Sequence, residues 1–241
     1  MIQFFAPEIE ATGMLPPDES RHCSKVLRHR VGDEIQVIDG KGRRFTCVIL
    51  DPDPRATQVE IVSSEQLPQH WGVNITLAVA PTKNMDRMEW LVEKAVEIGV
   101  NRFVPLLCEH SERKVVKTER LMNIAVSAMK QSLKTTLPEI LPLTPIKDFL
   151  NENSGSEDSA AQKFMGYCDA DYPRKSLIQE YQPGKNVILM IGPEGDFSPE
   201  EVRKAVEAGF LPVTFGDSRL RTETAALVAL DAIHFLNYLK S

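Results

Sequence analysis

Val187-Ile-Leu-Met-Ile-Gly-Pro-Glu-Gly-Asp-Phe-Ser198 combines a strand pattern, a glycine turn and a helix start. The five apolar residues 187–191 do not alternate with polar ones, which is typical of a strand buried on both faces. The glycines of Gly192-Pro-Glu-Gly195 let the backbone turn tightly and approach a ligand closely. Ser198-Pro-Glu-Glu201 then offers an N-cap, a proline at the first helical position and a capping-box acid. This order indicates an α/β domain, whose ligands bind outside the carboxyl ends of parallel strands.

The segments on either side of it also alternate between strand and helix patterns. We expect strands at 73–80, 103–108, 163–168, 187–191 and 213–215, and helices at 85–98, 119–134, 198–209 and 222–239. The helix at 85–98 should turn Met88, Leu91, Val92, Ala95 and Val96 inward. The polar segment 153–159 should be a loop. Residues 73–241 are therefore predicted to form an α/β domain with a parallel sheet covered on both faces.

Residues 1–70 have a different texture and are predicted to form a small β-rich domain. The segments 34–39 and 43–50 flank Gly40-Lys-Gly42 and indicate a hairpin, and 57–62 is a further strand. We expect one helix over 21–29, with Cys23, Val26 and Leu27 on one face, ended by Gly32-Asp33. The segment 64–72 is the expected linker.

The charge of the chain is unevenly distributed. The formal net charge is −6, from 28 basic and 34 acidic residues, which on its own argues against a nucleic-acid partner. Residues 21–44, however, contain seven basic and three acidic side chains, and residues 102–134 contain the same numbers. Two stretches of local charge +4 therefore lie in an otherwise acidic chain.

The remaining composition indicates an ordinary globular protein. The four cysteines are Cys23, Cys47, Cys108 and Cys168, and their wide spacing suits neither a zinc site nor a disulfide framework. We expect no metal, since the sequence contains no His/Cys cluster. The N-terminus has no signal-peptide pattern, and no apolar run approaches the roughly 20 residues of a membrane span. The expected location is the cytoplasm, without a membrane partner.

The second informative segment is Phe215-Gly-Asp-Ser-Arg-Leu-Arg-Thr-Glu-Thr-Ala-Ala226. A short strand ends here, a polar loop follows, and Thr222 is the predicted cap of an apolar helix. Arg221 comes just before the helix start, where the helix dipole disfavours a cation. We therefore expect a specific partner for Arg221, such as an acidic side chain or a phosphate, with solvent-facing charge as the alternative.

Neither glycine-bearing loop matches a phosphate-binding fingerprint. Gly192-Pro-Glu-Gly195 is not a G-x-G-x-x-G motif and lacks the lysine of a P-loop. A single G-x-x-G is also compatible with a plain strand-to-helix turn. A phosphate-bearing cofactor is therefore not indicated.

Gly-Pro-Glu-Gly followed by Leu-Arg-Thr-Glu-Thr-Ala resembles the SPOUT methyltransferase superfamily and, more closely, the bacterial RsmE family. The resemblance extends to 21–28 with Val31-Gly-Asp33, to Lys83 with 88–99, to Ser111-Glu-Arg113 and to Lys130-Gln-Ser132. Several motifs in one order over nearly the whole chain make it specific. It implies a PUA-like β-barrel at 1–70, binding RNA, and a SPOUT α/β domain with a deep trefoil knot at 73–241. It also implies a homodimer whose second subunit helps to complete each active site.

The resemblance implies S-adenosylmethionine as cofactor and methylation of ring nitrogen N3 of a uridine in small-subunit (16S) ribosomal RNA, as part of the 30S subunit or alone. The cofactor would lie against Met190, Ile191, Gly192, Pro193, Glu194, Gly195, Phe215, Gly216, Ser218 and Leu220. Ile191 and Leu220 would enclose the adenine. The implied RNA-binding residues are Arg21, His22, Lys25, Arg28, Lys83, Arg113, Lys130 and Gln131.

Methylation at N3 requires help from the protein, because this nitrogen carries a proton and is a weak nucleophile. A base must take the proton, or a cation must stabilise the uridine anion. Arg221 is the candidate cation. Glu194 and Glu223 are candidates for the base or for orienting that arginine, and helix capping or backbone support is an equal alternative.

The sequence also departs from the family pattern. Asp196 stands where the family has a second glycine, Ser218 stands where it has an arginine, and Arg219 replaces an isoleucine. Gln131-Ser-Leu-Lys134 replaces Gln-Ser-Gly-Arg. Two other functions remain open, namely methylation of a ribose 2′-hydroxyl by a SPOUT enzyme and a non-catalytic RNA-binding role in ribosome assembly.

Overall fold

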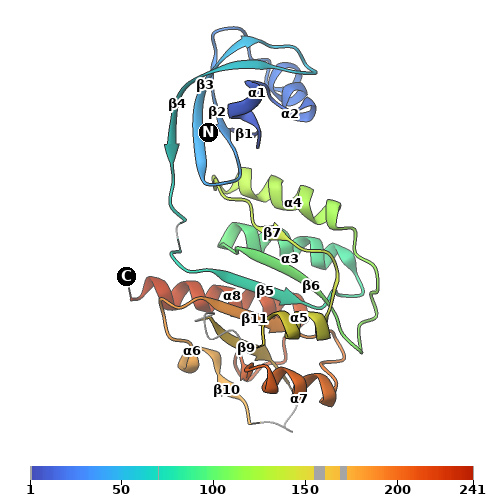
Figure 1. Ribbon diagram of the computed structural model, residues 1–241. Coiled ribbons are helices and arrows are strands. Elements are labelled where there is room, and N and C mark those ends of the chain that lie inside the picture. The colour runs from blue at the N-terminus through green and yellow to red at the C-terminus, as the bar shows by residue number, and fades with distance from the viewer. Residues whose placement is uncertain (1, 70, 155–160, 169–172, 241) are drawn as a thin grey trace. The chain divides into compact units, whose positions relative to one another are not determined.

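In the computed structural model, which describes residues 2–69, 71–154, 161–168 and 173–240, Val187–Ile191 is strand β11 (Figure 1). All five of its side chains are buried, with exposed fractions of 6% or less. Its neighbours are β5 (Ile75–Val79) and β9 (Gln162–Gly166), both parallel to it. The predicted doubly buried strand is confirmed.

The sheet that contains β11 has the order β10-β12-β9-β11-β5-β6-β7, with β8 beside β6, and each of these pairs is parallel. Its remaining strands are β6 (Arg102–Leu107), β7 (Glu139–Ile140), β8 (Thr144–Pro145), β10 (Lys175–Ser176) and β12 (Leu211–Thr214). The parallel α/β sheet is confirmed. The trefoil knot stays a prediction.

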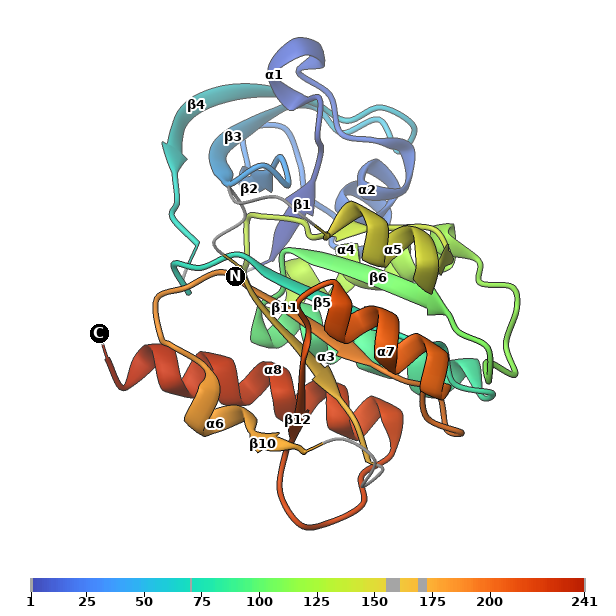
Figure 2. The same cartoon turned by 60° about the horizontal axis from the view of Figure 1, so that its bottom comes forward.

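Helices cover both faces of this sheet. Ile188 and Met190 share a buried cluster with Phe149 of α5 (Ile146–Glu152) and Val202 of α7 (Pro199–Glu207). The opposite face packs against α8 (Thr222–Tyr238), which also contacts α3 (Met85–Ile98). Figure 2 shows α7 and α8 on either side of the strands. The five residues expected to face inward on α3 are all buried, so that prediction is confirmed.

Helix α7 begins with the predicted capping box. The Ser198 hydroxyl accepts from the Glu201 amide, and Glu201 Oε2 accepts from the Ser198 amide at 2.9 Å. Glu201 Oε1 accepts from the Glu109 amide at 2.8 Å. This carboxylate is only 8% exposed, so one side chain joins the start of α7 to the loop after β6. Two loops at the carboxyl ends of the strands are therefore held together.

The described residues divide into two units, and the division differs from a simple boundary near residue 70. Unit 1 contains Met1–His70 and Ala125–Leu137, and unit 2 contains Trp71–Ile124 and Pro138–Ser241. Helix α4 (Thr118–Gln131) therefore contributes residues to both. Within unit 1 the Gly42 amide donates to the Thr135 carbonyl and the Leu137 amide donates to the Gly40 carbonyl. Residues 125–137, which we expected in the second domain, thus hydrogen-bond to the turn of the first hairpin.

Unit 1 contains a four-stranded sheet in the order β1-β2-β3-β4. The strands are β1 (Gln3–Phe5), β2 (Glu34–Ile38), β3 (Arg43–Asp51) and β4 (Gln58–Gln66), and short helices α1 (Ile9–Thr12) and α2 (Pro17–Arg21) accompany them. The β2–β3 hairpin is confirmed. Strand β4 runs to Gln66 because it pairs with β3 as far as Arg43, so the linker predicted at 64–72 begins too early.

The helix predicted at 21–29 is shorter and differently wound. After α2 the chain forms a π-helical segment, η1 (His22–Val26), in which the Leu27 amide donates to the His22 carbonyl. Cys23 is buried as expected, but Val26 is 66% exposed, because the wider turn rotates it away from the core. Arg28, with φ of 60°, ends the helix before Gly32-Asp33.

The described residues contain neither a membrane-spanning helix nor a metal-binding cluster. None of their helices combines the length and apolar character that a membrane span requires. No group of three or more His, Cys, Asp or Glu side chains among them is arranged to hold a metal ion.

Glu201→Ala should lower the free energy of unfolding by about 2–4 kcal/mol, because the buried amide of Ser198 and the amide of Glu109 lose their acceptor. Urea unfolding followed by circular dichroism measures the loss. Glu200→Ala is the matched control, since Glu200 is exposed and pairs at the surface with Arg203 and Lys204. That control should cost far less stability, because exposed ion pairs contribute little. Equal losses in the two variants would contradict the role given to Glu201.

Candidate functional site

A pocket of about 910 Å³ lies in unit 2 at the carboxyl ends of β9, β11 and β12. Three segments that follow these strands form most of its wall, at 166–168, 191–196 and 213–223. Figure 2 shows the loop between β12 and α8 at this end of the sheet. The pocket therefore lies where an open parallel sheet is expected to bind its ligand.

Nine of the ten residues expected to bind a cofactor line this pocket. They are Ile191, Gly192, Pro193, Glu194, Gly195, Phe215, Gly216, Ser218 and Leu220. Met190 is the exception, because its side chain is completely buried in the cluster beneath α5 and α7. Alternation along β11 turns Met190 to one face and Ile191 to the other.

Hydrogen bonds hold the glycine loop to its surroundings. The Glu194 carboxylate accepts from the Lys83 amide at 3.1 Å, and the Thr222 hydroxyl donates to the Gly192 carbonyl at 3.2 Å. We predicted Thr222 as the cap of α8, but the N-cap position is Arg221, without a side-chain cap bond. Thr222 is instead the first helical residue, and its hydroxyl joins α8 to the glycine loop.

Four arginines line the pocket, and they differ in how they are paired. Arg87 lies 3.7 Å from Glu223, whose side chain is 9% exposed. Arg174 donates to the Cys168 carbonyl at 2.9 Å. The guanidinium groups of Arg219 and Arg221 have no hydrogen-bond or ion-pair partner among the described residues, and both side chains are exposed. Arg221 thus has no acidic partner among these residues, and its charge is available to a ligand such as a phosphate, the other partner that we expected.

The three candidate catalytic residues all line the pocket but are not equivalent. Glu194 is exposed, with one carboxylate oxygen bonded to a backbone amide. Glu223 is buried and paired with Arg87, so it does not orient Arg221 as one prediction had it. Glu194 and Arg221 are therefore the pair with groups free to meet a ligand.

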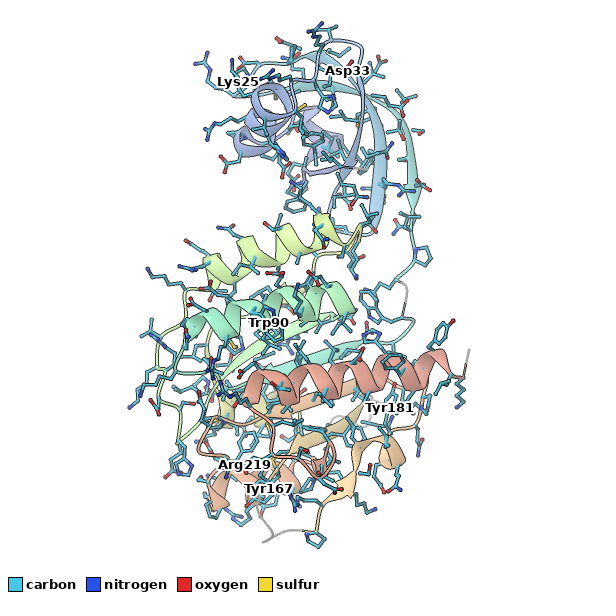
Figure 3. All side chains as sticks on the ribbon, turned by 180° about the vertical axis from the view of Figure 1, so that it is seen from behind. Lys25, Asp33, Trp90, Tyr167, Tyr181 and Arg219 are labelled. Carbon is cyan, nitrogen blue, oxygen red and sulfur yellow. The ribbon has the colours of Figure 1, made fainter. Side chains whose placement is uncertain are left out.

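The sequence did not reveal several residues of the pocket wall. Arg87 lies on the polar face of α3, and the helical pattern does not indicate that it pairs with the distant Glu223. Gly166 allows close packing, since a Cβ at this position would lie 2.7 Å from the ring of Phe215. Tyr167 and Cys168 follow Gly166, and Tyr167 lies at the same end of unit 2 as Arg219 (Figure 3). The one indication of this wall in the sequence was the strand predicted to end at residue 168.

The thiol of Cys168 is the exposed one of the four cysteines, all of which lie in the described part of the chain. Burial raises its pKa above the ordinary value, and the charge of Asp196 adds to this effect. The positive charges of Arg219 and Arg174 oppose it. The reactivity of the Cys168 thiol therefore depends on its exposure and on the charges in the pocket wall.

The RNA-binding candidates within residues 21–28 of unit 1 lie on or just after α2 and η1. Arg21, Lys25 and Arg28 are exposed, and Figure 3 shows Lys25 near the same end of the unit as Asp33. Arg21 lies 3.6 Å from Asp18 at the surface. His22 is half-buried and packs edge-on against Phe4. Cationic groups on this surface are therefore open to a polyanion.

The remaining RNA-binding candidates are more restricted. Lys83 lies 2.9 Å from Glu112, and Arg113 donates to the Lys83 carbonyl, both within unit 2. In unit 1, Lys130 lies 2.5 Å from Glu19 and is 19% exposed, while its neighbour Gln131 is exposed. Ion pairing thus uses part of the positive charge that the sequence places in residues 102–134.

Comparison with known proteins agrees with this architecture. A family model described as an RNA methyltransferase domain matches residues 69–234, and one described as an RNA methyltransferase PUA domain matches residues 15–62. The crystal structure of a probable rRNA methyltransferase from Porphyromonas gingivalis is 44% identical, with a TM-score of 0.93 and 100% of both chains covered.

Two further proteins are similar over most of their length, and the structure of one of them contains a bound ligand. The structure of a ribosomal RNA small subunit methyltransferase E from Neisseria gonorrhoeae, bound to S-adenosyl methionine, is 30% identical, with a TM-score of 0.84 and 98% of each chain covered. The ribosomal RNA small subunit methyltransferase E of Synechocystis is 32% identical, over 96% of this chain and 76% of its own.

Iodoacetamide should add once to the native protein, at Cys168, because the other three thiols are buried. The thiolate is the reacting form and the pKa of Cys168 is raised, so the rate should still increase with pH above about 8.5, the usual pKa of a thiol. Intact-protein mass spectrometry counts the adducts, and Cys168→Ser should take up none. A plateau in rate below pH 8.5, or labelling of that variant, would contradict the assignment.

Proposed function

The chain belongs to the ribosomal RNA small subunit methyltransferase E family, and on this premise we propose that it methylates ring nitrogen N3 of one uridine in 16S ribosomal RNA, with S-adenosylmethionine as methyl donor. One observation carries the proposal. The pocket at the carboxyl ends of the strands combines glycine-bearing loops with the guanidinium of Arg221, which has no partner among the described residues.

The residues of the pocket fit this cofactor. At Gly216, with φ of 132°, an added Cβ would meet nothing within 4 Å, so the backbone lies open to a ligand. Ile191, Phe215 and Leu220 give the same wall an apolar surface suited to an adenine ring. A volume of about 910 Å³ is within the range of small-molecule sites. When bound, S-adenosylmethionine supplies an electrophilic methyl group on a sulfonium ion.

The protein's part in the reaction is to make the uridine nitrogen nucleophilic. The Glu194 carboxylate, exposed at the pocket and bonded by one oxygen to the Lys83 amide, accepts the proton of N3. The guanidinium of Arg221 stabilises the negative charge that develops on the base. Arg87 neutralises Glu223, so this second carboxylate does not repel the negative charge on the base.

The RNA is held by contacts outside the pocket. Arg21, Lys25 and Arg28 of unit 1 bind phosphates, which fixes the position of the RNA without reading its sequence. The target uridine must leave its stack to enter the pocket. This division of work suits a protein whose total charge is negative, because only a few cations contact the RNA.

The active form is a homodimer located in the cytoplasm, where ribosomal subunits are made. Supporting the dimer, unit 2 exposes large apolar side chains on α8 and α3, namely Val228, Phe235, Tyr238 and Trp90. Exposed fractions of 60% at Phe235 and 46% at Trp90 are high for aromatic side chains. A second copy would cover them.

Small-subunit RNA from a strain that lacks the protein should be missing one 3-methyluridine, and adding the protein with S-adenosylmethionine should restore it. Nucleoside mass spectrometry distinguishes this product from a 2′-O-methyl nucleoside, which would instead support the ribose reaction. Restored ribosome assembly without any methyl group would support the non-catalytic role.

Arg221→Ala is the informative variant in that assay and should lower kcat at least 100-fold, because the developing negative charge loses its cation. Its affinity for S-adenosylmethionine should change less than threefold. Arg203→Ala, which removes an exposed arginine paired with Glu200 and Glu207, is the matched control and should stay fully active.

The double variant Arg21→Glu with Arg28→Glu should bind RNA at least tenfold more weakly while its affinity for S-adenosylmethionine is unchanged, since both side chains lie in unit 1. Filter binding at several salt concentrations should also show a smaller salt dependence. Lys147→Glu with Lys185→Glu changes the charge equally at exposed positions elsewhere and should leave binding intact. Equal losses of RNA and cofactor binding would refute the role of unit 1.

A further inference from the structure

We propose that Asp196 is a positioning residue that clamps the end of β9 to the glycine loop and so sets the shape of the pocket that binds S-adenosylmethionine. The cofactor assignment in this inference rests on the proposed function. The clamp itself rests on the geometry of the described residues around Asp196.

The backbone of Asp196 has an unusual conformation. Its φ is 60°, in the left-handed region that most residues with a side chain avoid. The Asp196 amide donates to the Pro193 carbonyl at 3.0 Å and closes the turn of the glycine loop. A glycine would adopt this conformation without strain, so the aspartate side chain must offer something that glycine lacks.

What the side chain offers is a carboxylate that accepts from two backbone amides. Oδ1 accepts from the Phe197 amide at 2.9 Å, a local bond that helps aspartate to tolerate the left-handed conformation. Oδ2 accepts from the Cys168 amide at 3.0 Å, and Cys168 lies just after β9, the strand next to β11. Charged acceptors make stronger hydrogen bonds than neutral ones, so this bond is a firm link between the two segments.

The link joins two walls of one pocket. Cys168 and Asp196 both line it, and the Cys168 carbonyl accepts from Arg174 at 2.9 Å. The peptide groups of Cys168 are therefore held on one side by Asp196 and on the other by Arg174. Each oxygen of Asp196 accepts from one backbone amide, so the carboxylate holds this wall of the pocket in position.

A second contact supports the same turn from the opposite direction. His110 Nδ1 lies 3.2 Å from the Gly195 carbonyl and 3.0 Å from the Asp196 carbonyl. A Cβ at Gly195 would lie 3.3 Å from that of His110. The turn is thus fixed by backbone and histidine contacts, and the side chain of Asp196 is left to hold the far wall.

Three variants separate the clamp from the backbone and from the charge. Asp196→Gly keeps the left-handed turn but removes the acceptor, and Asp196→Asn removes the charge but keeps an oxygen for the Cys168 amide. Asp148→Asn is the control, since it removes an exposed carboxylate of α5 that is not part of the pocket wall. Isothermal titration calorimetry with S-adenosylmethionine and methyl-transfer kinetics give the affinity, KM and kcat of each.

We expect Asp196→Gly to bind S-adenosylmethionine at least tenfold more weakly, with the loss mainly in KM, and Asp196→Asn to remain within threefold of the unmodified protein. Asp148→Asn should bind S-adenosylmethionine and turn over as the unmodified protein does. Melting temperatures without cofactor should agree within a few degrees for all forms. Gly and Asn variants that both bind normally, or that lose affinity equally, would overturn the clamp.

A cofactor-free measurement keeps this test distinct from the proposed function. In the apo protein, iodoacetamide should react with Cys168 at least fivefold faster in Asp196→Gly than in Asp196→Asn, because both lack the charge and only the first lacks the clamp. Failure of the unmodified protein to bind S-adenosylmethionine would refute the cofactor. Equal thiol rates in the two variants would refute the role of Asp196.

Discussion

The complete burial of β11 is the constraint on which the rest of unit 2 depends. Each of its five side chains contributes roughly 1.5–3 kcal/mol when removed from water, but only if both faces of the sheet are covered. Helices α5 and α7 cover one face, and α8, packed on α3, covers the other. Loops can then leave the sheet only at the ends of its strands, and three that follow neighbouring strands at its carboxyl end form the pocket.

The sequence was sufficient wherever a short segment carries its own signal. The strand Val187–Ile191, the buried face of α3 and the capping box of Ser198 each depend on residues close together in the chain, and all three predictions are confirmed. The glycine-bearing loops that line the pocket were identified for the same reason. The helix after residue 21 was less predictable, because nothing in its apolar spacing signals a π-helical turn.

Contacts between distant residues could not be predicted. Glu223 pairs with Arg87, and Asp196 accepts from Cys168, across separations that no local pattern encodes. The charge count had the same weakness. Arg43 pairs with Glu10 and Asp39, and Lys130 pairs with Glu19. Two basic residues of the +4 stretches are therefore paired with acidic residues, and Glu10 and Glu19 lie outside those stretches. Within the part of the chain that the structure describes, the cations without a partner, such as Lys25 and Arg28, are fewer than the sequence suggested.

The division of helix α4 between the two units has a consequence for the order of folding during synthesis. The hairpin turn at Gly40–Gly42 receives its partners from Thr135 and Leu137, and Glu19 receives its counterion from Lys130. A nascent chain of only the first 70 residues therefore forms an incomplete unit 1, in which these polar groups are still exposed to water. The N-terminal unit reaches its final state only after β5 and β6, the first two strands of the parallel sheet in chain order, have been made, so maturation of the two units is interleaved in time.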